Sequence, residues 1–548
     1  MALTVALSQF NASVGDIDSN INTMRQFYND AVESGADVIV FPELCVCGYP
    51  PEDLLLRPQF MQDNFDSVKN FAKGCSKSVV IVGFAQQEDN KRFNSLAVIE
   101  KGQIQNIYHK NILPNYSVFD EKRYFEKGSD LLVIEVKGIK IALTICEDIW
   151  DFNHLDKFKT HLENGMIINI SASPFNLGKI DQRQKILSKC AKYFNCAVAY
   201  CNLVGGQDEL IFDGRSMFAD SSGTIVSQAK AFEEDILIAN IRFDDSTKVN
   251  IENIKAHKTY PEPMQLEPIE AVYKALLLGT RDYVHKNGFS KVLIGLSGGI
   301  DSSLTAAIAA DALGAENVVG VTMPSRFNSA DTISDAEKTA LNMKLQFHTV
   351  AIEDILKAFD NTLKVINGWE DKGLAFENLQ ARIRGCILMS MSNQFGYLVL
   401  TTGNKSETAV GYSTLYGDTA GGFAVIKDVP KTMVYELSRF INKSHCKEFI
   451  PVSVIERPPS AELRANQKDS DSLPEYDLLD KIIKGYIEQD MSRKELTQSG
   501  LPAEEVSRIA SLIDHNEYKR RQSPPGIKIT PKAFGKDRRM PINNRYRG

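Results

Sequence analysis

The chain has 548 residues, 43% of them hydrophobic and 24% charged, which is typical of a soluble globular protein with about two to four domains. Its net charge of −7 argues against a general nucleic-acid-binding protein. The nine cysteines form no CxxC pair and no zinc-finger spacing with the eight histidines, so neither a zinc site nor a disulfide framework is expected. The N-terminus lacks the cationic region of a signal peptide, and no apolar run approaches the roughly 20 residues that span a bilayer. We therefore expect a cytoplasmic protein that binds neither membrane nor nucleic acid.

Short apolar strands alternate with polar helical stretches through the first 250 residues or so. The pattern fades in a polar, proline-rich segment at 246–268, which we interpret as a linker between domains at 1–245 and 269–548. The strands expected in the first domain lie at 38–41, 79–82, 140–145, 166–170 and 197–201.

A second α/β pattern follows the linker. A helix is expected from 269 to about 287, and another at 304–313. The last thirty residues, 519–548, carry ten Lys or Arg and one acidic residue, so most of this tail is expected to be a solvated extension. The strands expected in this half lie at 292–296, 317–322, 347–351 and 397–402.

Three segments of the first half carry candidate catalytic groups. Glu43 follows an apolar strand, Lys110 stands in a His-Lys-Asn segment, and Cys146 ends another apolar strand. Taken alone, such a cysteine is most often a buried core thiol, and a lone Glu or Lys is most often a solvated surface charge. Together, and in this order, they resemble the Glu–Lys–Cys triad of the nitrilase and amidase superfamily over about residues 1–240. The resemblance implies an αββα sandwich.

The resemblance also implies the chemistry of this half. A free thiol has a pKa of about 8.5, so a base must help to form the thiolate. Glu43 is the implied general base, Cys146 the nucleophile that attacks an amide carbon, and Lys110 the group that stabilises the oxyanion. No histidine is needed, so a Cys–His dyad with His109 is not expected. The implied contacts of a glutamine substrate are Tyr116, Glu147, Ser173 and Lys179, with Glu147 pairing with the ammonium group.

A glycine-rich turn joins the strand at 292–296 to the following helix. Such a turn directs backbone N–H groups at one point, and the helix N-terminus adds partial positive charge, so the segment predicts a phosphate site. It is not a Walker loop, because no Lys-Ser or Lys-Thr follows the glycines. It resembles the pyrophosphate loop of the N-type ATP pyrophosphatases, which implies a doubly wound parallel sheet that binds ATP. The residues concerned are Gly295, Leu296, Ser297, Gly298, Gly299, Ile300, Asp301 and Ser302.

Further motifs at 374–384, 400–408, 416–418 and 429–432 resemble the NAD synthetase family, over about residues 269–521. The resemblance implies that a carboxylate of deamido-NAD is adenylated and that ammonia displaces AMP. It also implies at least a homodimer. The implied roles are ATP contacts for Thr402 and Lys431, deamido-NAD contacts for Asn378, Glu407 and Lys519, and Mg²⁺ ligation by Asp301 and Glu407.

The two halves together predict an ATP-dependent carbon–nitrogen ligase in which glutamine hydrolysis supplies ammonia for amidation. Covalent linkage would raise the effective ammonia concentration at the acyl-adenylate, and we hypothesise a protected passage between the sites. Two alternatives stay open. One is a glutamine-fed adenylating amidotransferase with a different acceptor carboxylate, and the other is a non-catalytic protein that senses ATP or NAD.

Overall fold

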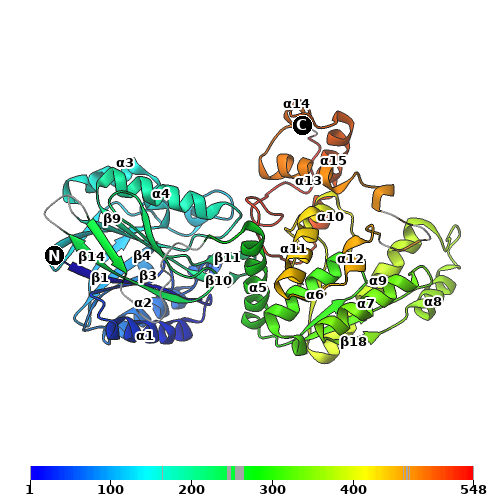
Figure 1. Cartoon of the computed structure of the whole chain (residues 1–548), viewed down its shortest axis with the longest axis horizontal. Coiled ribbons are helices and arrows are strands. Elements are labelled where there is room, and N and C mark those ends of the chain that lie inside the picture. The colour runs from blue at the N-terminus through cyan, green and yellow to red at the C-terminus, as the bar shows by residue number, and fades with distance from the viewer. Residues whose placement is uncertain are drawn as a thin grey trace. The chain divides into compact units, whose positions relative to one another are not determined.

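The computed structural model describes residues 2–162, 165–243, 249–253, 265–460, 462–464, 467 and 469–546. The chain divides into two compact units, Met1–Leu266 and Glu267–Gly548 (Figure 1). The division falls in the segment expected to be a linker, 246–268. Residues 249–253 of that segment form a strand, whereas 246–248 and 254–264 lie outside the described residues.

Two sheets form the centre of the first unit. The strands are β1 (Ala2–Gln9), β2 (Val38–Val40), β3 (Val79–Glu88), β4 (Lys91–Glu100), β5 (Gln103–His109), β6 (Leu132–Val136), β7 (Ile139–Ile145), β8 (Met166–Ser171), β9 (Ala197–Asn202), β10 (Val204–Gln207), β11 (Leu210–Asp213), β12 (Met217–Ala219), β13 (Ile225–Gln228), β14 (Asp235–Phe243) and β15 (Val249–Asn253). The first sheet has the order β15-β14-β1-β2-β3-β4-β5, and the second has the order β13-β12-β9-β8-β7-β6. Strands β10 and β11 pair separately as a hairpin.

The helices of this unit cover the outer faces of the two sheets (Figure 1). Successive residues of a strand point to opposite faces, and β1 shows the result: Val5 and Leu7 join a core that also contains Ile141 and Leu143 of the second sheet, whereas Ala6 joins the core beneath the helices. This confirms the expected αββα sandwich. The helices and short helical turns are α1 (Ile17–Glu33), η1 (Glu52–Leu56), α2 (Pro58–Ala72), η2 (Glu121–Arg123), η3 (Cys146–Trp150), α3 (Phe152–Leu155), η4 (Asp156–His161) and α4 (Lys179–Phe194).

The second unit is built on a parallel sheet. Its elements are α5 (Pro268–Lys286), β16 (Val292–Gly295), α6 (Ile300–Leu313), η5 (Ala315–Asn317), β17 (Val318–Thr322), α7 (Ala330–Met343), β18 (Gln346–Thr349), α8 (Glu353–Leu363), α9 (Gly373–Phe395), β19 (Leu398–Thr401), α10 (Lys405–Val410), β20 (Phe423–Ala424), α11 (Lys431–Ser444), α12 (Val452–Glu456), η6 (Asp469–Asp471), α13 (Tyr476–Ile483), η7 (Lys484–Glu488), α14 (Arg493–Gln498), α15 (Ala503–His515) and α16 (Glu517–Arg520).

The strand order of this sheet places a ligand site. The order is β18-β17-β16-β19-β20, and every pair is parallel. Helices α5, α6 and α11 pack together with α6 against β16 and β17, while α8 and α9 share a core with Leu293 and Val319. The doubly wound sheet is therefore confirmed. The chain reverses direction across the sheet between β16 and β19, and open α/β sheets bind ligands at the carboxyl ends of the strands at such a point.

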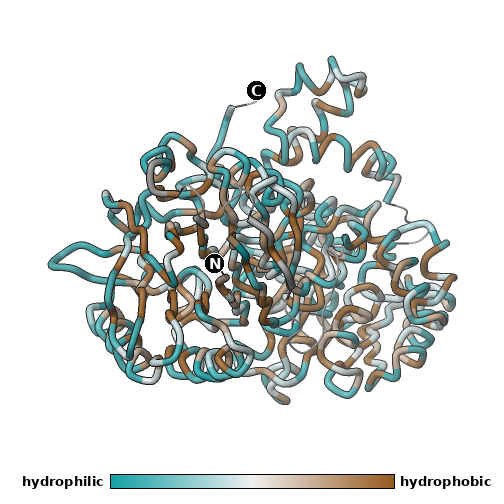
Figure 2. The backbone as a smooth tube through the Cα atoms, turned by 60° about the vertical axis from the view of Figure 1, so that its left-hand side comes forward, coloured by the Kyte–Doolittle hydropathy of each residue, from teal (hydrophilic) through white to brown (hydrophobic). Residues whose placement is uncertain are grey.

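The apolar pattern of the sequence places most of these strands. Strands β2, β3, β7, β8, β9, β16, β17, β18 and β19 coincide with predicted segments to within a few residues, except that β3 continues to Glu88. Figure 2 shows the corresponding hydrophobic stretches inside each unit and hydrophilic loops outside. Among the described residues, no helix is both long and apolar enough to cross a lipid bilayer.

The prediction for the C-terminal tail is wrong. Ile527, Ile529 and Phe534 are buried, and Asp428 accepts hydrogen bonds from the backbone N–H groups of Ile529 and Thr530, at 2.8 and 2.7 Å. Several basic residues of this segment are paired inside the fold rather than solvated. Two of these pairs are Lys528–Asp537 at 2.5 Å and Arg538–Glu517 at 2.7 Å.

The buried ammonium of Lys405 ties this tail to α10. Its Nζ lies 2.9 Å from Asp428 Oδ1 and 2.7 Å from Glu488 Oε1, and it donates to Thr530 Oγ1 at 2.6 Å. A buried charge is tolerated when it is paired and hydrogen-bonded, as here. The C-terminal segment is therefore part of the framework that holds the β19–α10 turn.

Replacing Lys405 by Met should destabilise the second unit by about 3–5 kcal/mol, because two buried carboxylates lose their counter-charge. Urea unfolding can be followed unit by unit, since the two tryptophans, Trp150 and Trp369, lie in different units. In a Trp150→Phe background the Lys405→Met change should lower the unfolding midpoint reported by Trp369. The matched control is Lys357→Met in the same unit, whose exposed pair with Asp354 should leave the midpoint unchanged. An unchanged Trp369 midpoint in the Lys405 variant would contradict the prediction.

Candidate active sites

Three strand ends of the first unit bring the predicted triad to the same end of the sandwich. Glu43 lies three residues after β2, Lys110 directly follows β5, and Cys146 directly follows β7. Glu43 and Lys110 are completely buried, and Cys146 is 6% exposed. A lysine without exposure requires anionic partners, and the structure supplies two of them.

Lys110 lies between two carboxylates. Its Nζ donates to Glu43 Oε1 at 2.7 Å and to Glu121 Oε1 at 2.8 Å. Asn94 Nδ2 donates to the same oxygen of Glu43 at 2.7 Å, and the backbone N–H of Ala172 donates to Glu43 Oε2 at 2.7 Å. These bonds fix both oxygens of Glu43.

The backbone of β3 packs directly against the Glu43 turn. A Cβ atom at Gly83 would lie 2.3 Å from the carbonyl oxygen of Pro42 and 2.7 Å from Glu43 Cα. Any side chain at position 83 would therefore displace the Glu43 backbone, so only glycine fits here.

Glu121 is a site residue that the sequence did not reveal. It stands in the charged run Asp120-Glu-Lys-Arg123, which is typical of a solvated surface, yet its side chain is buried. Burial raises the pKa of Glu121 to about 7, although the positive charge of Lys110 opposes that shift. Tyr49 OH also donates to Glu121 Oε1, at 3.1 Å. No local pattern marks this residue, because its burial depends on partners far along the chain.

Cys146 stands on a strained turn between β7 and η3. Its φ is 46°, a conformation that non-glycine residues adopt rarely and mostly at functional sites. Burial raises the pKa of the Cys146 thiol well above its usual value, Glu43 raises it further, and Lys110 lowers it. The thiol therefore needs a base and the lysine charge before it can act as a nucleophile.

Asp148 joins the Cys146 turn to the segment after Lys110. Its buried carboxylate accepts from the backbone N–H of Ile145 at 3.0 Å, of Asn111 at 3.0 Å and of Ile112 at 2.8 Å, and from Tyr108 OH at 2.8 Å. The two strand ends that carry Lys110 and Cys146 are thus held by one side chain.

His109 points away from the thiol. Its Nδ1 lies 2.8 Å from Ser95 Oγ, its Nε2 lies 3.6 Å from Glu88, and its ring stacks on Phe93. These contacts account for the ring, in keeping with the expectation that His109 forms no dyad with Cys146.

Three of the four residues predicted to contact glutamine, Tyr116, Glu147 and Lys179, lie in or against η3. Tyr116 OH donates to Glu147 Oε1 at 2.9 Å, and Glu147 directly follows Cys146. Lys179 Nζ lies 4.8 Å from the ring centroid of Trp150, at the other end of η3. The backbone N–H of Ser173 donates to Asn202 Oδ1 at 2.9 Å, one residue beyond the Ala172 contact to Glu43.

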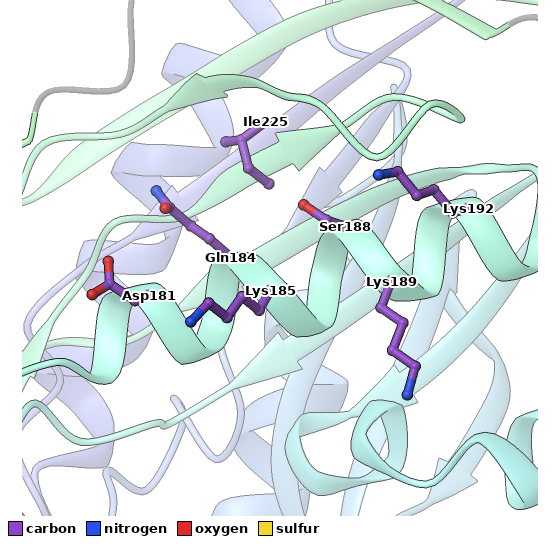
Figure 3. A pocket seen from close by; sticks show the side chains of 7 residues that line it. All are labelled: Asp181, Gln184, Lys185, Ser188, Lys189, Lys192 and Ile225. Carbon is purple, nitrogen blue, oxygen red and sulfur yellow. The ribbon is translucent and has the colours of Figure 1, made fainter.

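An open groove on the outer face of α4 is a separate feature. Figure 3 shows the side chains that line it, all from α4 except Ile225 of β13. The lining includes Lys185, Lys189 and Lys192, but none of the residues predicted to act on glutamine. We therefore assign no catalytic role to this groove.

A cavity of about 310 Å³ in the second unit lies at the carboxyl ends of β16 and β19. All ten residues predicted to contact ATP line it, from Gly295 to Ser302 together with Thr402 and Lys431. Gly298 has a φ of 80°, and a Cβ atom there would lie 2.1 Å from the carbonyl oxygen of Thr332. Only glycine allows the turn to pack against α7 while its backbone faces the cavity.

Lys431 lies between two carboxylates in this cavity. Its Nζ is 2.5 Å from Asp301 Oδ2 and 3.3 Å from Glu407 Oε1. Burial raises the pKa of Glu407 to about 8, against the lowering effect of Lys431. Asn404 Nδ2 donates to Asp301 Oδ1 at 2.9 Å, which orients that carboxylate. In the described part of the chain, no cluster of three or more His, Cys, Asp or Glu side chains forms a complete metal site by itself.

The remaining two predicted residues lie beside the cavity. Lys519 Nζ donates to the carbonyl oxygens of Gly411 and Ser413, at 2.8 and 2.9 Å, and lines a smaller cavity that shares Glu407 with the larger one. Asn378 Oδ1 accepts from Thr414 Oγ1 at 2.7 Å, and Thr414 lines the larger cavity.

The chain matches two protein families. Residues 4–250 match the carbon–nitrogen hydrolase family, and residues 272–523 match the NAD synthase family. The glutamine-dependent NAD(+) synthetase of Thermotoga maritima is 44% identical over an alignment of 573 positions that covers 100% of this chain and 99% of the relative. The enzyme of that name from Acinetobacter baylyi is 47% identical, with 99% and 98% covered. A solved structure of glutamine-dependent NAD+ synthetase from Acinetobacter baumannii with ADP has a TM-score of 0.79 and 42% identity, with 99% and 98% covered.

Replacing Glu121 by Gln should make Cys146 more reactive at pH 8. The Gln side chain keeps an oxygen that accepts from Lys110 and Tyr49, but it removes a negative charge that raises the pKa of the Cys146 thiol. We expect alkylation of Cys146 by iodoacetamide to become at least about threefold faster. The reaction is followed by mass spectrometry of the Cys146 peptide, because Cys386 and Cys446 are exposed and also react.

The control is Glu121→Ala, which removes the oxygen as well as the charge and leaves Lys110 with one partner fewer. A slower or unchanged alkylation in Glu121→Gln would show that the Glu121 charge does not control the thiol.

Proposed function

Because the chain belongs to the glutamine-dependent NAD(+) synthetases, we propose that its two sites divide the reaction between them. The first unit releases ammonia from glutamine at Glu43, Lys110 and Cys146. The second uses ATP to activate deamido-NAD for amidation. The observation that carries the proposal is the buried lysine beside two carboxylates and a strained cysteine, in a chain whose other unit holds a glycine-lined cavity at the switch point of a parallel sheet.

In the glutaminase reaction, Glu43 takes the proton of Cys146 and the thiolate attacks the amide carbon of glutamine. Lys110 stabilises the negative charge that develops on the amide oxygen, and its charge also favours the thiolate. Glu43 passes the proton to the amide nitrogen, so ammonia leaves and a thioester forms. Glu43, ionised again, then activates the water that hydrolyses the thioester to glutamate and restores the thiol. Burial strengthens the electrostatic stabilisation that Lys110 gives to the negative charge on the amide oxygen, because charges interact more strongly when water is excluded.

The two charged ends of glutamine select different parts of the site. Glu147, held by Tyr116, is placed to accept the α-ammonium group. Ser173 and Lys179 form the other side of the site, and Lys179 begins α4, where the helix dipole favours an anion. We therefore assign the α-carboxylate to the Ser173–Lys179 side.

In the synthetase reaction, the backbone of the 297–299 turn and the N-terminus of α6 bind the phosphates of ATP. Thr402 and Lys431 add side-chain contacts, and Asn378, Glu407 and Lys519 lie on the side assigned to deamido-NAD. The nicotinate carboxylate attacks the α-phosphorus of ATP and releases pyrophosphate. Ammonia then attacks the adenylated carboxyl carbon, forming the amide of NAD and releasing AMP.

The carboxylates of this cavity fit a Mg²⁺ ion. Mg²⁺ is usually held by one or two carboxylates together with substrate phosphates, and Asp301 and Glu407 provide two hard oxygen ligands at the glycine turn. Within the described residues, Lys431 is the cation that forms ion pairs with both carboxylates, and burial raises the pKa of Glu407 to about 8. When bound, the ion would neutralise phosphate oxygens and the leaving pyrophosphate.

The organisation of the chain follows from the two activities. We assign 1–245 to the glutamine amidase domain, with β15 extending its sheet, and 269–548 to the synthetase domain. Joining the ammonia source to the amidating site raises the effective ammonia concentration, since free ammonia at neutral pH is mostly protonated. All nine cysteines are free thiols, which supports a reducing cytoplasm.

An apolar surface of the synthetase domain supports a homodimer. Exposed apolar side chains are common singly, but here they gather on α8, α9 and the segment between them. We propose that a second copy of the chain covers this face, as the family resemblance implies. The residues are Ile355, Phe359, Val365, Ile366, Leu374, Met389 and Phe395.

Cys146→Ala should abolish NAD formation from glutamine while leaving the reaction with ammonium intact. The change removes the nucleophile of the first site but no group of the ATP cavity. NAD is measured with deamido-NAD, ATP and Mg²⁺, and with glutamine or ammonium as the nitrogen donor. We expect a loss of at least about 10³-fold with glutamine and a change below about twofold with ammonium.

Cys190→Ala is the matched control, because it removes a buried thiol from the same unit outside the triad. Full glutamine-dependent activity in Cys146→Ala would show that the triad is wrongly assigned. If the wild type forms no NAD from either donor, deamido-NAD is not the acceptor.

Glu407→Gln should raise the Mg²⁺ requirement of the ammonium reaction by about tenfold or more, because one of two ligating carboxylates is lost. In the wild type the requirement should also rise as the pH falls below about 8, because a proton then competes for Glu407. Half-saturating Mg²⁺ is measured between pH 6.5 and 9 in the wild type, in Glu407→Gln and in Glu337→Gln, an exposed control on α7. An unchanged Mg²⁺ requirement in Glu407→Gln would remove this residue from the metal site.

A further inference from the structure

Arg183 is a buried cation that the reaction described above does not use. It lies on α4, but its side chain is 1% exposed and points into the unit rather than outward like the lysines of Figure 3. Arginine stays protonated inside proteins and can only donate hydrogen bonds, so its burial requires several acceptors.

Those acceptors belong mainly to the turn that carries Ser173. Arg183 Nε donates to Ser173 Oγ at 3.1 Å, and Nη2 donates to the carbonyl oxygens of Ser173 and Pro174 at 2.7 and 3.1 Å. Nη1 donates to Asp213 Oδ1 at 2.6 Å, and Asp213 is also 1% exposed. The guanidinium is thus fixed from one side by a carboxylate and fixes the turn with its other side.

The direction of the Nε bond determines what the Ser173 hydroxyl can do. A hydroxyl can donate once and accept twice, and Arg183 cannot accept. Ser173 Oγ must therefore accept from Arg183, which turns the hydroxyl hydrogen away from α4. The hydroxyl hydrogen is then available to another acceptor: the phenol of Tyr200 also interacts with the Ser173 side chain, and a bound substrate would be a second acceptor.

The backbone of the same turn has a second anchor. The N–H of Ser173 donates to Asn202 Oδ1 at 2.9 Å, and Asn202 Nδ2 donates to the carbonyl oxygen of Ser173 at 3.3 Å. The N–H of Ala172 donates to Glu43 Oε2 at 2.7 Å. A change at Arg183 should therefore disturb the hydroxyl more than the backbone that holds Glu43.

We propose that Arg183, fixed by Asp213, is a positioning residue that sets glutamine specificity by orienting the Ser173 hydroxyl as a donor to the α-carboxylate of the substrate. The proposal rests on the glutamine site described under the proposed function. Arg183 itself does not touch the substrate. It acts through Ser173, beside Lys179 and the N-terminus of α4, where an anionic group is favoured.

The test compares Arg183→Lys, Arg183→Met and Asp213→Asn with the wild type. The KM for glutamine in glutamate release should rise by about 10- to 100-fold, the range that a lost hydrogen bond to a charged group gives, while kcat changes by less than about threefold. Alkylation of Cys146 by iodoacetamide, an amide without an α-carboxylate, should change by less than about threefold. NAD formation from ammonium should be unchanged. The KM of Arg183→Lys should lie between those of Arg183→Met and the wild type, because lysine keeps the positive charge but not the several fixed N–H donors of the guanidinium.

Ser173→Ala separates positioning from folding, because it leaves Arg183 and Asp213 in place. This variant should show the same rise in KM, and adding Arg183→Lys to it should raise KM by less than about threefold more, since the two changes act on one hydroxyl. If the two increases in KM multiply in the double variant, Arg183 does not act through the Ser173 hydroxyl. If KM rises while kcat and the rate of alkylation fall to a similar extent, the role of the arginine is merely structural. If the wild type releases no glutamate from glutamine, the glutamine site itself is wrong. A wild type that hydrolyses glutamine and variants with unchanged KM would overturn only the role of Arg183.

Discussion

The site of the first unit depends on one buried ammonium group held between two carboxylates. Lys110 has no exposed surface, and its contacts with Glu43 and Glu121 are 2.7 and 2.8 Å. Removing three charges from water is costly, and only close pairing with further hydrogen bonds offsets that cost. Asn94, Ala172 and Tyr49 provide those bonds, so the positions of the groups proposed as general base and oxyanion stabiliser follow from the requirement to satisfy a buried lysine.

The second unit repeats this arrangement on a different fold. Lys431 lies between Asp301 and Glu407, again with one carboxyl group whose pKa is raised by burial. The proposed roles of the two lysines differ. In the proposed reaction Lys110 faces the negative charge that develops during attack on an amide, whereas Lys431 lines the cavity proposed to bind the phosphates of ATP. Glu43, Lys110, Asp301 and Glu407 each lie within six residues of a strand end, where a rigid sheet fixes the positions of side chains from different segments.

The sequence predicts those site residues that are marked by the residues next to them in the chain. Glu43, Cys146 and the Gly298 turn each follow an apolar strand, so the strand pattern and the residue type together mark them. Glu121 and Arg183 stand in polar stretches, and nothing nearby distinguishes them from solvated charges. Their burial comes from Lys110 and Asp213, which the fold brings to them. The C-terminal tail misleads for the same reason, since the acidic partners of its basic residues are contributed in part by distant segments.

Burial of these carboxyl groups has a cost that the rest of the fold must offset. Carboxyl groups titrate near 4.3 in an unfolded chain, whereas the pKa values of Glu121 and Glu407 are about 7 and about 8. Between these limits the folded chain binds more protons than the unfolded chain, so both groups make stability fall as the pH rises from about 4.5 toward 8. At neutral pH these two carboxyl groups therefore lower the free energy of unfolding. A fold selected for stability alone would place neither carboxyl group there, and their presence agrees with the charges that the proposed reaction must stabilise.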